Sequence, residues 1–317
     1  MQRVLIVGGA GYIGGYTTDL LKREGYDVAV YDSLLYEDRY LKNIPFIYGD
    51  IRDTNKLIEV ADQYDCIVLA AALVGDPACS VDSLLTEEIN YSAIKRFTYR
   101  ISNSKRLIFL STCSVYGAQD GVLTEQSPTN PLSTYASTKL RAEQHILDKG
   151  GVVFRLGTVF GLGDTYSRIR LDLVVNVLTL KAVKEGKITV SGGDQWRPII
   201  AVRDIAQYIS EAVNNKVAGI FNLSYKNTTI RELGDEVCNL ILGTQIEYTP
   251  MSFQDARNYR VSTEAVDKAF QYRPIASVKS EVIKMSKLFQ ENRIKDDSSF
   301  LYNNGKFIQS LKNNNGL

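Results

Sequence analysis

Short apolar runs alternate with longer amphipathic stretches through the first half of this 317-residue chain, and this alternation restricts the possible fold more than any other feature. Runs with the length and composition of buried strands are VLIVG (4–8), VAVYD (28–32), PFIYGD (45–50), CIVLAA (66–71), RLIFLS (106–111) and VVFRL (152–156). The stretches with helical periodicity are TTDLLKREG, NKLIEVADQ, LLTEEINYSAIKRFTYRISN and TYASTKLRAEQHILDKG. The pattern predicts an α/β fold with a parallel sheet that carries helices on both faces.

The pattern changes after Gly161. A helical stretch, LDLVVNVLTLKAVKEG, leads to a short strand (ITVSGG), and RPIIAVRDIAQYISEAV then returns to the sheet. Residues after about 225 predict a smaller unit of helices and strands, and the Asn/Gly/Ser-rich end of the chain predicts an extended or partly disordered tail. We therefore expect a sheet domain of residues 1–162 and 196–224, a smaller C-terminal α/β substrate domain of residues 163–195 and 225–290, and a tail of residues 291–317.

Composition excludes several other classes of protein. The formal net charge is +1, so charge gives no reason to expect a nucleic-acid or membrane partner. No apolar run approaches the roughly 20 residues that span a bilayer, and the N-terminus enters a strand directly instead of forming a signal peptide. The four cysteines lack metal-ligand spacing, and the single histidine, His145, argues against a histidine-centred metal site. We expect a cytoplasmic enzyme with reduced thiols and no metal.

A glycine-rich turn follows the first strand. Gly8, Gly11 and Gly14 form G-x-x-G-x-x-G between a strand and a helix, where a phosphate pair can approach the backbone closely. A tight turn with packing glycines would look similar. Asp32 ends the second strand, where its carboxylate can accept hydrogen bonds from an adenosine ribose and would repel a 2′-phosphate. The sequence therefore predicts a Rossmann-like domain that binds NAD in preference to NADP.

The expected NAD contacts extend along the ends of the predicted strands. Asp50 can reach the adenine amine, or else it caps the following helix. The full set is Gly8, Gly11, Tyr12, Ile13, Gly14, Asp32, Ser33, Asp50, Ile51, Ala70, Ala71, Ala72, Tyr135 and Lys139.

Tyr135 and Lys139, in YASTK (135–139), project from one face of a predicted helix. Tyrosine is a poor base at neutral pH, and lowering its pKa from about 10 to about 7 takes about 4 kcal/mol. One cation about 4 Å away supplies that order of energy at an effective dielectric constant near 20. With Lys139 and the positive nicotinamide ring nearby, Tyr135 could accept a proton from a sugar hydroxyl that Thr112 orients. An exposed Tyr/Lys pair on a helix is the alternative.

The motifs VGGAGYIGG, YDSL, GDIRD, LAAALVGD, STCSVYG and YASTK occur in that order. In this combination the chain resembles the extended short-chain dehydrogenase/reductase family, in its branch of nucleotide-sugar epimerases and dehydratases. The resemblance covers about residues 1–285. It implies a Rossmann domain with NAD, a smaller domain that holds a nucleoside-diphosphate sugar, and a place in polysaccharide, capsule or lipopolysaccharide sugar biosynthesis. By position, Thr112, Tyr135 and Lys139 match the family's catalytic hydroxyl, tyrosine and lysine.

The chain departs from the family's 4,6-dehydratases at Cys113 and Ser114. Those enzymes read S-T-D-E-V-Y-G here, and their acid pair removes the C5 proton and protonates the departing C6 hydroxyl. An ordinary cysteine has a pKa near 8.5 and serine does not titrate, so a dehydratase is disfavoured. The family's 3,5-epimerases carry a proton-shuttling cysteine two residues before the tyrosine of this motif, whereas Cys113 lies three before Tyr116. We expect Cys113 to fill space beside the sugar.

The expected substrate contacts lie in three further segments. QWRPIIAVRD (195–204) resembles the family's R-D-F-I-H-V-x-D segment, which makes Arg197 the candidate for the substrate diphosphate and leaves Ala201 where the family has histidine. SRIRLDLVVN (167–176) resembles the substrate-domain helix of capsule-sugar enzymes, including nucleotide-heptose 4-dehydrogenases, so Asn176 is a further candidate for the diphosphate. In the third segment, DARNYRVS (255–262), Arg257 is the candidate for a second cation at the diphosphate. The full set is Val74, Asp76, Cys113, Ser114, Asn176, Arg197 and Arg257.

These features favour an NAD-dependent nucleotide-sugar enzyme that acts at C4. A 4-epimerase and a net 4-dehydrogenase or 4-ketoreductase share the same three catalytic residues, so the sequence leaves both open. A catalytically silent NAD-binding regulator is the alternative of another class. We also expect a homodimer, because family members pair the helices that LLTEEINYSAIKRFTYRIS and YASTKLRAEQHIL form here.

Overall fold

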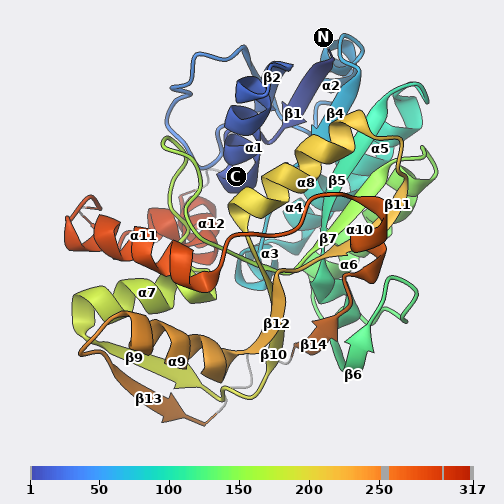
Figure 1. The fold of residues 1–317 in the computed structure, drawn as a ribbon. Helices are drawn as coiled ribbons and strands as arrows, with labels where there is room; N and C mark the ends of the chain where they lie inside the picture. The colour runs from blue at the N-terminus through green and yellow to red at the C-terminus, as the bar shows by residue number, and fades with distance from the viewer. Residues whose placement is uncertain (1, 251–256, 295, 315–317) are drawn as a thin grey trace.

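A seven-stranded parallel sheet forms the centre of the computed structural model, which describes residues 2–250, 257–294 and 296–314. Its order is β11-β7-β5-β4-β1-β2-β3, with every neighbouring pair parallel (Figure 1). The strands are β1 (Arg3–Val7), β2 (Asp27–Asp32), β3 (Phe46–Tyr48), β4 (Cys66–Leu69), β5 (Arg106–Thr112), β7 (Val152–Leu156) and β11 (Gly219–Leu223). The predicted Rossmann-like sheet is confirmed, and its chain order reverses between β1 and β4, where folds of this kind bind ligands.

Helices cover both faces of the sheet. Successive side chains of a strand point to opposite faces, so Val4 and Ile6 of β1 enter one core cluster while Leu5 and Val7 enter the other. The first face carries α1 (Tyr12–Arg23) and α8 (Val202–Asn214). The second face carries α2 (Thr54–Ala61), α5 (Ala93–Arg100) and α6 (Thr134–Leu147).

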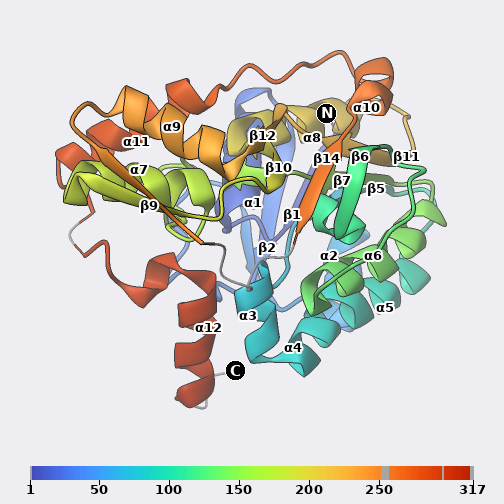
Figure 2. The same cartoon turned by 90° about the horizontal axis from the view of Figure 1, so that it is seen from below.

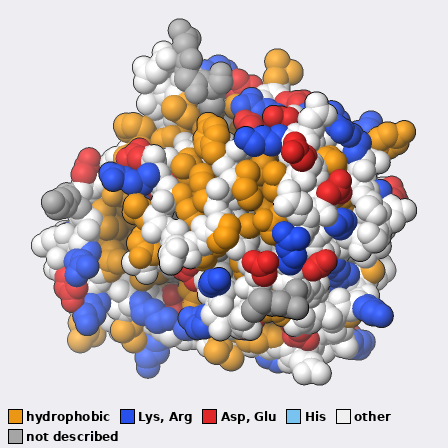
Figure 3. All heavy atoms as spheres, turned by 90° about the horizontal axis from the view of Figure 1, so that it is seen from above, with side chains coloured by type: hydrophobic (Ala, Val, Ile, Leu, Met, Phe, Trp, Pro, Cys, Tyr) orange, Lys and Arg blue, Asp and Glu red, His pale blue; other side chains and the backbone are white. Residues whose placement is uncertain are grey.

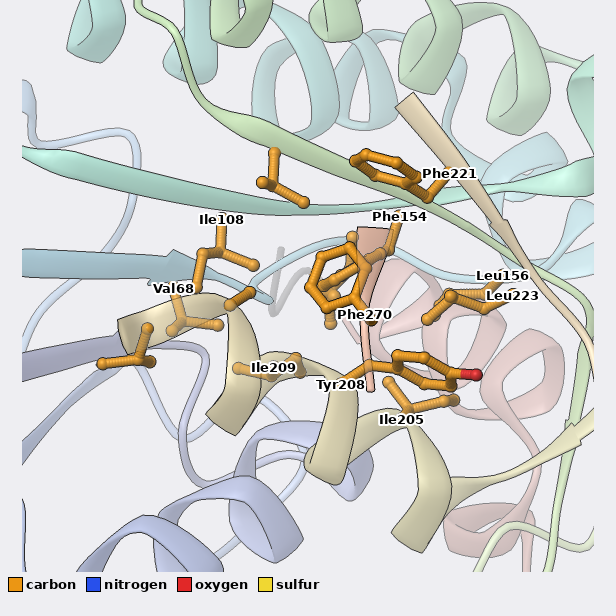
Figure 4. Close-up of a cluster of buried hydrophobic side chains, with 14 of the residues drawn as sticks. Val68, Ile108, Phe154, Leu156, Ile205, Tyr208, Ile209, Phe221, Leu223 and Phe270 are labelled. Carbon is orange, nitrogen blue, oxygen red and sulfur yellow. The ribbon is translucent and has the colours of Figure 1, made fainter. Parts of the chain in front are cut away.

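The core beneath α8 is rich in aromatic rings (Figure 4). Tyr208 of α8 and Phe270, which follows α10 (Glu264–Ala269), meet with ring centroids 6.0 Å apart in an edge-on contact. Phe154 of β7 lies 5.6 Å from the Phe270 ring. Because each ring buries a large apolar area, this cluster fixes α8 and the segment after α10 on the sheet.

A smaller α/β unit lies beside the sheet, at the lower left of Figure 1. Its strands are β8 (Thr158–Phe160), β10 (Trp196–Ala201) and β12 (Lys226–Thr229), which form one sheet, and β9 (Lys187–Ser191) and β13 (Gln245–Thr249), which form another. Its helices are α7 (Val174–Glu185), α9 (Ile230–Leu240) and α11 (Val278–Gln290). They enclose a third core cluster that includes Phe160, Leu233 and Met285.

Two further elements were not anticipated. β6 (Ala118–Leu123) pairs with β14 (Asn258–Val261), so the segment after STCSVYG is held against a strand more than a hundred residues away. The long helix predicted over residues 84–103 is α4 (Ser83–Glu87), a π-helical turn (Glu88–Ser92) and α5. Within the described ranges, none of the helices has both the length and the apolar character needed to cross a bilayer.

The prediction of an extended or disordered tail is wrong for the described part of residues 291–317. A 3₁₀ turn (Phe300–Tyr302) leads to α12 (Asn304–Asn313), which packs beside α3 (Asp76–Val81), as Figure 2 shows. Phe307 and Ile308 are buried there among Leu73 and Cys79. Apolar side chains at Phe307, Ile308 and Leu311 give the segment a helical face that its polar composition concealed.

Charge is mixed on the face drawn in Figure 3. Lys and Arg side chains lie among Asp and Glu side chains, around apolar groups near the middle of the view. This face therefore has no extended region of a single charge sign.

Candidate active site

The glycine-rich turn joins β1 to α1. Gly8 has a φ of +88°, and a Cβ added to it would lie 2.4 Å from the backbone nitrogen of Ala71. A Cβ on Gly14 would lie 2.1 Å from the carbonyl oxygen of Gly8. Glycine is therefore required at both positions, and the first amides of α1 are left open to a phosphate pair, as binding of a dinucleotide demands.

Asp32 is fixed at the end of β2. Its carboxylate accepts hydrogen bonds from the backbone N–H of Ala10, at 3.0 Å, and of Leu34, at 2.8 Å. Burial raises the pKa of Asp32, while hydrogen bonds from backbone N–H groups oppose that rise. The carboxylate thus has a fixed direction beside the glycine-rich turn, with further oxygen lone pairs that a ribose could use.

A cavity of about 250 Å³ lies along the carboxyl ends of the central strands. Twelve of the fourteen predicted NAD contacts line it, and Tyr135 and Lys139 do not. Asp50 lines the cavity and pairs with Arg52 at 2.7 Å. The alternative role of Asp50 as a helix cap is wrong, because Asp53 caps α2 by accepting from the backbone N–H of Lys56.

The predicted catalytic side chains lie next to one end of this cavity. Tyr135 packs against the apolar cluster that contains Leu73, and Leu73 also lines the cavity. Thr112, at the end of β5, lies near enough to Tyr135 for its side chain to lower the pKa of that phenol. The ammonium of Lys139 donates to the carbonyl oxygen of Leu110 at 2.8 Å and lies 4.5 Å from the centre of the Phe109 ring. The structure therefore brings Thr112, Tyr135 and Lys139 together.

Burial perturbs both titrating groups. It raises the pKa of Tyr135 above its ordinary value, and the negative charge of Asp76 adds to that rise, while Arg170 and the nearby hydroxyl of Thr112 oppose it. Burial also lowers the pKa of Lys139 to about 8. The protein alone therefore keeps Tyr135 neutral, and activation of this phenol as a base requires a further positive charge.

A buried ion pair supports the catalytic helix from behind. Glu143 of α6 and Arg155 of β7 are 2% and 3% exposed, and their charged groups meet at 2.7 Å. Ser111, beside Thr112, donates to Glu143 at 2.5 Å, and Arg155 donates to the hydroxyl of Tyr116 at 2.9 Å. This network ties α6 to β5 and β7, and the motif analysis missed it because its members are far apart in sequence.

Cys113 and Ser114 are both buried, but their surroundings differ. Cys113 is fully buried, its thiol donates to the carbonyl oxygen of Arg155, and burial raises its pKa. We therefore correct the prediction that Cys113 lies beside the sugar, because the side chain belongs to the core. The hydroxyl of Ser114 lies 3.3 Å from that of Tyr259 and accepts from Arg257 at 3.4 Å.

The two predicted diphosphate arginines lie near each other. Arg197 is 3% exposed and donates to the carbonyl oxygens of Trp196 and Arg257. The Arg257 guanidinium lies 3.3 Å from the carboxylate of Asp76. Asp76 in turn accepts from the hydroxyl of Ser133, the N-cap of α6, at 2.6 Å. Asp76 thus links Arg257 to the helix that carries Tyr135.

Asn176 is a structural residue in this fold. It is fully buried, its amide oxygen accepts from the N–H of Gly161, and its amide nitrogen donates to the carbonyl oxygens of Gly161 and Arg170. Both N–H groups of the Asn176 amide donate within the chain, so the predicted diphosphate contact of Asn176 is corrected.

Asp204, which ends the segment QWRPIIAVRD, is also buried. Its carboxylate accepts from the hydroxyl of Tyr272 and from the backbone N–H groups of Ile275 and Ala276.

The cavity wall includes residues that the motifs did not indicate. Arg168, Arg170 and Asn304 line it. Val74, a predicted substrate contact, lines the same cavity. Among the residues that the structure describes, no group of three or more His, Cys, Asp or Glu side chains could hold a metal ion.

Comparisons with known proteins agree with this geometry. The model of the NAD dependent epimerase/dehydratase family matches residues 4–224, and the chain belongs to this family. A UDP-glucose 4-epimerase of Lactobacillus helveticus is 26% identical over 281 residues, which are 78% of this chain and 84% of that protein. The family's cofactor is NAD, and the glycine turn, the Asp32 carboxylate and the cavity fit it.

Solved structures share the fold. The UDP-glucose 4-epimerase of Thermus thermophilus, in complex with NAD, has a TM-score of 0.78 at 24% identity and covers 91% of this chain and 99% of that chain. The dTDP-glucose 4,6-dehydratase of Bacillus anthracis str. Ames, also in complex with NAD, has a TM-score of 0.78 at 21% identity, over 92% of this chain and 97% of that chain. Epimerases and dehydratases thus lie equally near in fold, and the type of reaction must be argued from the site.

Proposed function

We propose that this protein is an NAD-dependent oxidoreductase or epimerase of nucleoside-diphosphate sugars that acts at C4 of the sugar. The observation that carries the proposal is the grouping of Thr112, Tyr135 and Lys139 at the end of the cavity, with Cys113 and Ser114 where a dehydratase has its acid pair. Cys113 has a buried thiol of raised pKa, and Ser114 does not titrate, so neither can protonate a leaving hydroxyl.

Each catalytic side chain has a distinct task in this proposal. Tyr135 accepts the proton of the C4 hydroxyl, and Thr112 orients that hydroxyl. Lys139 stabilises the phenolate from the position that Leu110 fixes. When bound, NAD supplies hydride acceptance and the positive charge that the protein alone lacks. Arg197 and Arg257 bind the substrate diphosphate, since a guanidinium can donate two parallel hydrogen bonds to it.

The named relatives favour a 4-epimerase among the possible outcomes. A 4-epimerase oxidises C4, lets the keto sugar turn, and reduces it from the other face. A net 4-dehydrogenase or 4-ketoreductase, on a heptose or another sugar, uses the same residues and remains the alternative. A silent NAD-binding regulator is disfavoured, because the chain retains Tyr135 and Lys139 in contact with their partners.

The rest of the proposal concerns organisation. We assign NAD to residues 1–162 and 196–224 and the nucleotide sugar to residues 163–195 and 225–290, in a cytoplasmic protein. We also propose a homodimer through α4, α5 and α6, which lie together at one side of the molecule (Figure 2). Leu84 and Tyr99 on these helices are 82% and 88% exposed, as expected of side chains that a second subunit covers.

Replacement of Tyr135 by phenylalanine tests the proposal. A panel of nucleoside-diphosphate sugars is first screened for turnover by NMR. With the active sugar, Tyr135→Phe should lower kcat by at least about a hundredfold and leave NAD binding nearly intact. Tyr91→Phe, whose ring packs under Arg141 on the neighbouring helix, is the control and should keep normal turnover. Near-normal turnover of Tyr135→Phe would remove this residue from the mechanism.

A further inference from the structure

Asn304, the first residue of α12, joins the C-terminal segment to the wall of the cofactor cavity. It is 3% exposed and lines the cavity. Its side-chain nitrogen donates to the carbonyl oxygen of Val74 at 2.9 Å, and its backbone N–H donates to the carboxylate of Asp172 at 2.9 Å. Its side-chain oxygen accepts from the guanidinium of Arg168. Asn304 therefore joins the C-terminal segment to two other segments, at Val74 and at residues 168–172.

These contacts of Asn304 fix the positions of two guanidinium groups, those of Arg168 and Arg170. Arg168 donates to Asn304 directly and to the carbonyl oxygen of Leu301 at 2.5 Å. Arg170 pairs with Asp172 at 2.6 Å, and Asp172 is the same carboxylate that accepts from the backbone of Asn304. The C-terminal segment thus holds Arg168 through a side chain and Arg170 through one intervening carboxylate.

The wall brings two buried guanidinium groups close together, with the carboxylates of Asp172 and Glu37 beside them. The guanidinium of Arg168 has carbonyl and amide oxygens as its hydrogen-bond partners and lies 4.0 Å from the centre of the Tyr36 ring. Among the described residues its guanidinium forms no direct ion pair, and the carboxylates of Asp172 and Glu37 act on it from a greater distance. Burial and the like charge of Arg170 lower the pKa of Arg168 to about 10. An anion in the cavity would relieve this repulsion.

A polar group without a partner lies beside these cations. The hydroxyl of Tyr36 is buried and makes no hydrogen bond among the described residues, although Tyr36 lines the same cavity. A buried hydroxyl without a hydrogen-bond partner costs free energy, and a ligand atom that accepted its hydrogen bond would remove that cost. A phosphate oxygen accepts hydrogen bonds from both a hydroxyl and a guanidinium.

Apolar packing keeps the segment in place. Phe307 and Ile308 of α12 are buried with Leu73 and Cys79, and Tyr135 packs against the same cluster. The ring of Phe307 lies 4.9 Å from that of Tyr36. The C-terminal helix is therefore built into the end of the cavity where the catalytic tyrosine lies.

We propose that Asn304 is a positioning residue that brings the C-terminal helix into the site and holds Arg168 and Arg170, with Tyr36, as a clamp for a diphosphate. The glycine-rich turn lines the same cavity and supplies backbone N–H groups, so side chains and backbone together would bind the diphosphate. Such a group occurs in the dinucleotide cofactor and in a nucleoside-diphosphate sugar. The inference concerns binding and stands apart from which reaction follows.

Titrations with three probes test the clamp. NAD and UDP each contain a diphosphate, and adenosine does not. Arg168→Gln and Asn304→Ala should lower the affinity for at least one diphosphate ligand by about tenfold or more and leave that for adenosine unchanged. Asn304→Asp should bind diphosphates no more tightly than Asn304→Ala, because its carboxylate would pair with Arg168 and could not donate to the carbonyl oxygen of Val74. Gln309→Ala is the control, because this exposed side chain of α12 donates only to Asn313 among the described contacts.

The pattern of losses decides the proposal. A loss for NAD alone identifies the cofactor's diphosphate as the ligand, and a loss for UDP alone identifies the substrate's. Unchanged affinities for both in Arg168→Gln would overturn the clamp. An equal loss for adenosine would also overturn it, since a general structural defect does not distinguish diphosphates. Arg168→Gln keeps the experiment decisive even if Asn304→Ala does not fold.

Discussion

Replacement of Lys139 by methionine should change how the stability of the cofactor-free protein depends on pH. Burial lowers the pKa of Lys139 from 10.5 to about 8, so the folded protein binds this proton less tightly than the unfolded chain does. Below about pH 8 the lysine is charged in both states, and folding bears the full cost of burying the charge. Between pH 8 and 10.5 the folded state has released the proton and the unfolded state still holds it.

The size of the effect follows from this difference. Where only the unfolded chain is protonated, the free energy of unfolding rises by about 1.4 kcal/mol per pH unit. From pH 7.5 to 9.5 the wild-type protein should therefore gain about 2 kcal/mol relative to Lys139→Met. The window ends at pH 9.5 because Tyr135 has a raised pKa, so its contribution to stability falls as pH rises above the ordinary tyrosine value near 10.

Urea unfolding at pH 7.5 and 9.5 measures this difference. The control is Lys95→Met on the exposed side of α5, which should follow the wild-type pH dependence. Taking the difference in unfolding free energy between variants cancels the contributions of the other groups that titrate between pH 7.5 and 9.5. If wild type and Lys139→Met showed the same pH dependence, Lys139 would not be the buried cation that the activation of Tyr135 requires.

Two further predictions concern the cofactor and the assembly. In parallel titrations the wild-type protein should bind NAD at least about tenfold more tightly than NADP, because the fixed Asp32 carboxylate repels a 2′-phosphate. Asp32→Ser should reduce this difference in affinity between the two cofactors. Equal wild-type affinities would refute the role of Asp32. Light scattering at micromolar concentration should give the mass of a dimer, and Tyr99→Asp together with Leu84→Asp should give that of a monomer; a monomeric wild-type protein would contradict the proposed interface.

The local motifs predicted those features of the fold and the site that depend on residues close together in the sequence. The alternation of strands and helices predicted the parallel sheet, and the glycine spacing predicted the turn at Gly8 and Gly14. Tyr135 and Lys139 could be paired because four residues on a helix bring two side chains to one face. In each case the information lies within a few residues of chain.

Contacts between residues far apart in the chain could not be predicted from the motifs. The pairing of Glu143 with Arg155 and the link from Asp76 to Ser133 join residues from different elements. The burial of Cys113 depends on which way the 3₁₀ turn directs its side chain, which residue spacing alone did not determine. Asn304 was missed for another reason, because the polar composition of its segment outweighed the apolar spacing of α12.

Isotope uptake from deuterated water tests the central claim most directly. The active nucleotide sugar is incubated with the protein in deuterated water, and the product is examined by NMR and mass spectrometry. Transfer at C4 by Thr112, Tyr135 and Lys139 requires no exchange at C5, so the product should keep its C5 hydrogen and its C6 hydroxyl. Obligatory deuterium at C5 together with loss of the C6 hydroxyl would contradict the account, and it would direct attention to Asp76 as the carboxylate near Tyr135 that does the acid work.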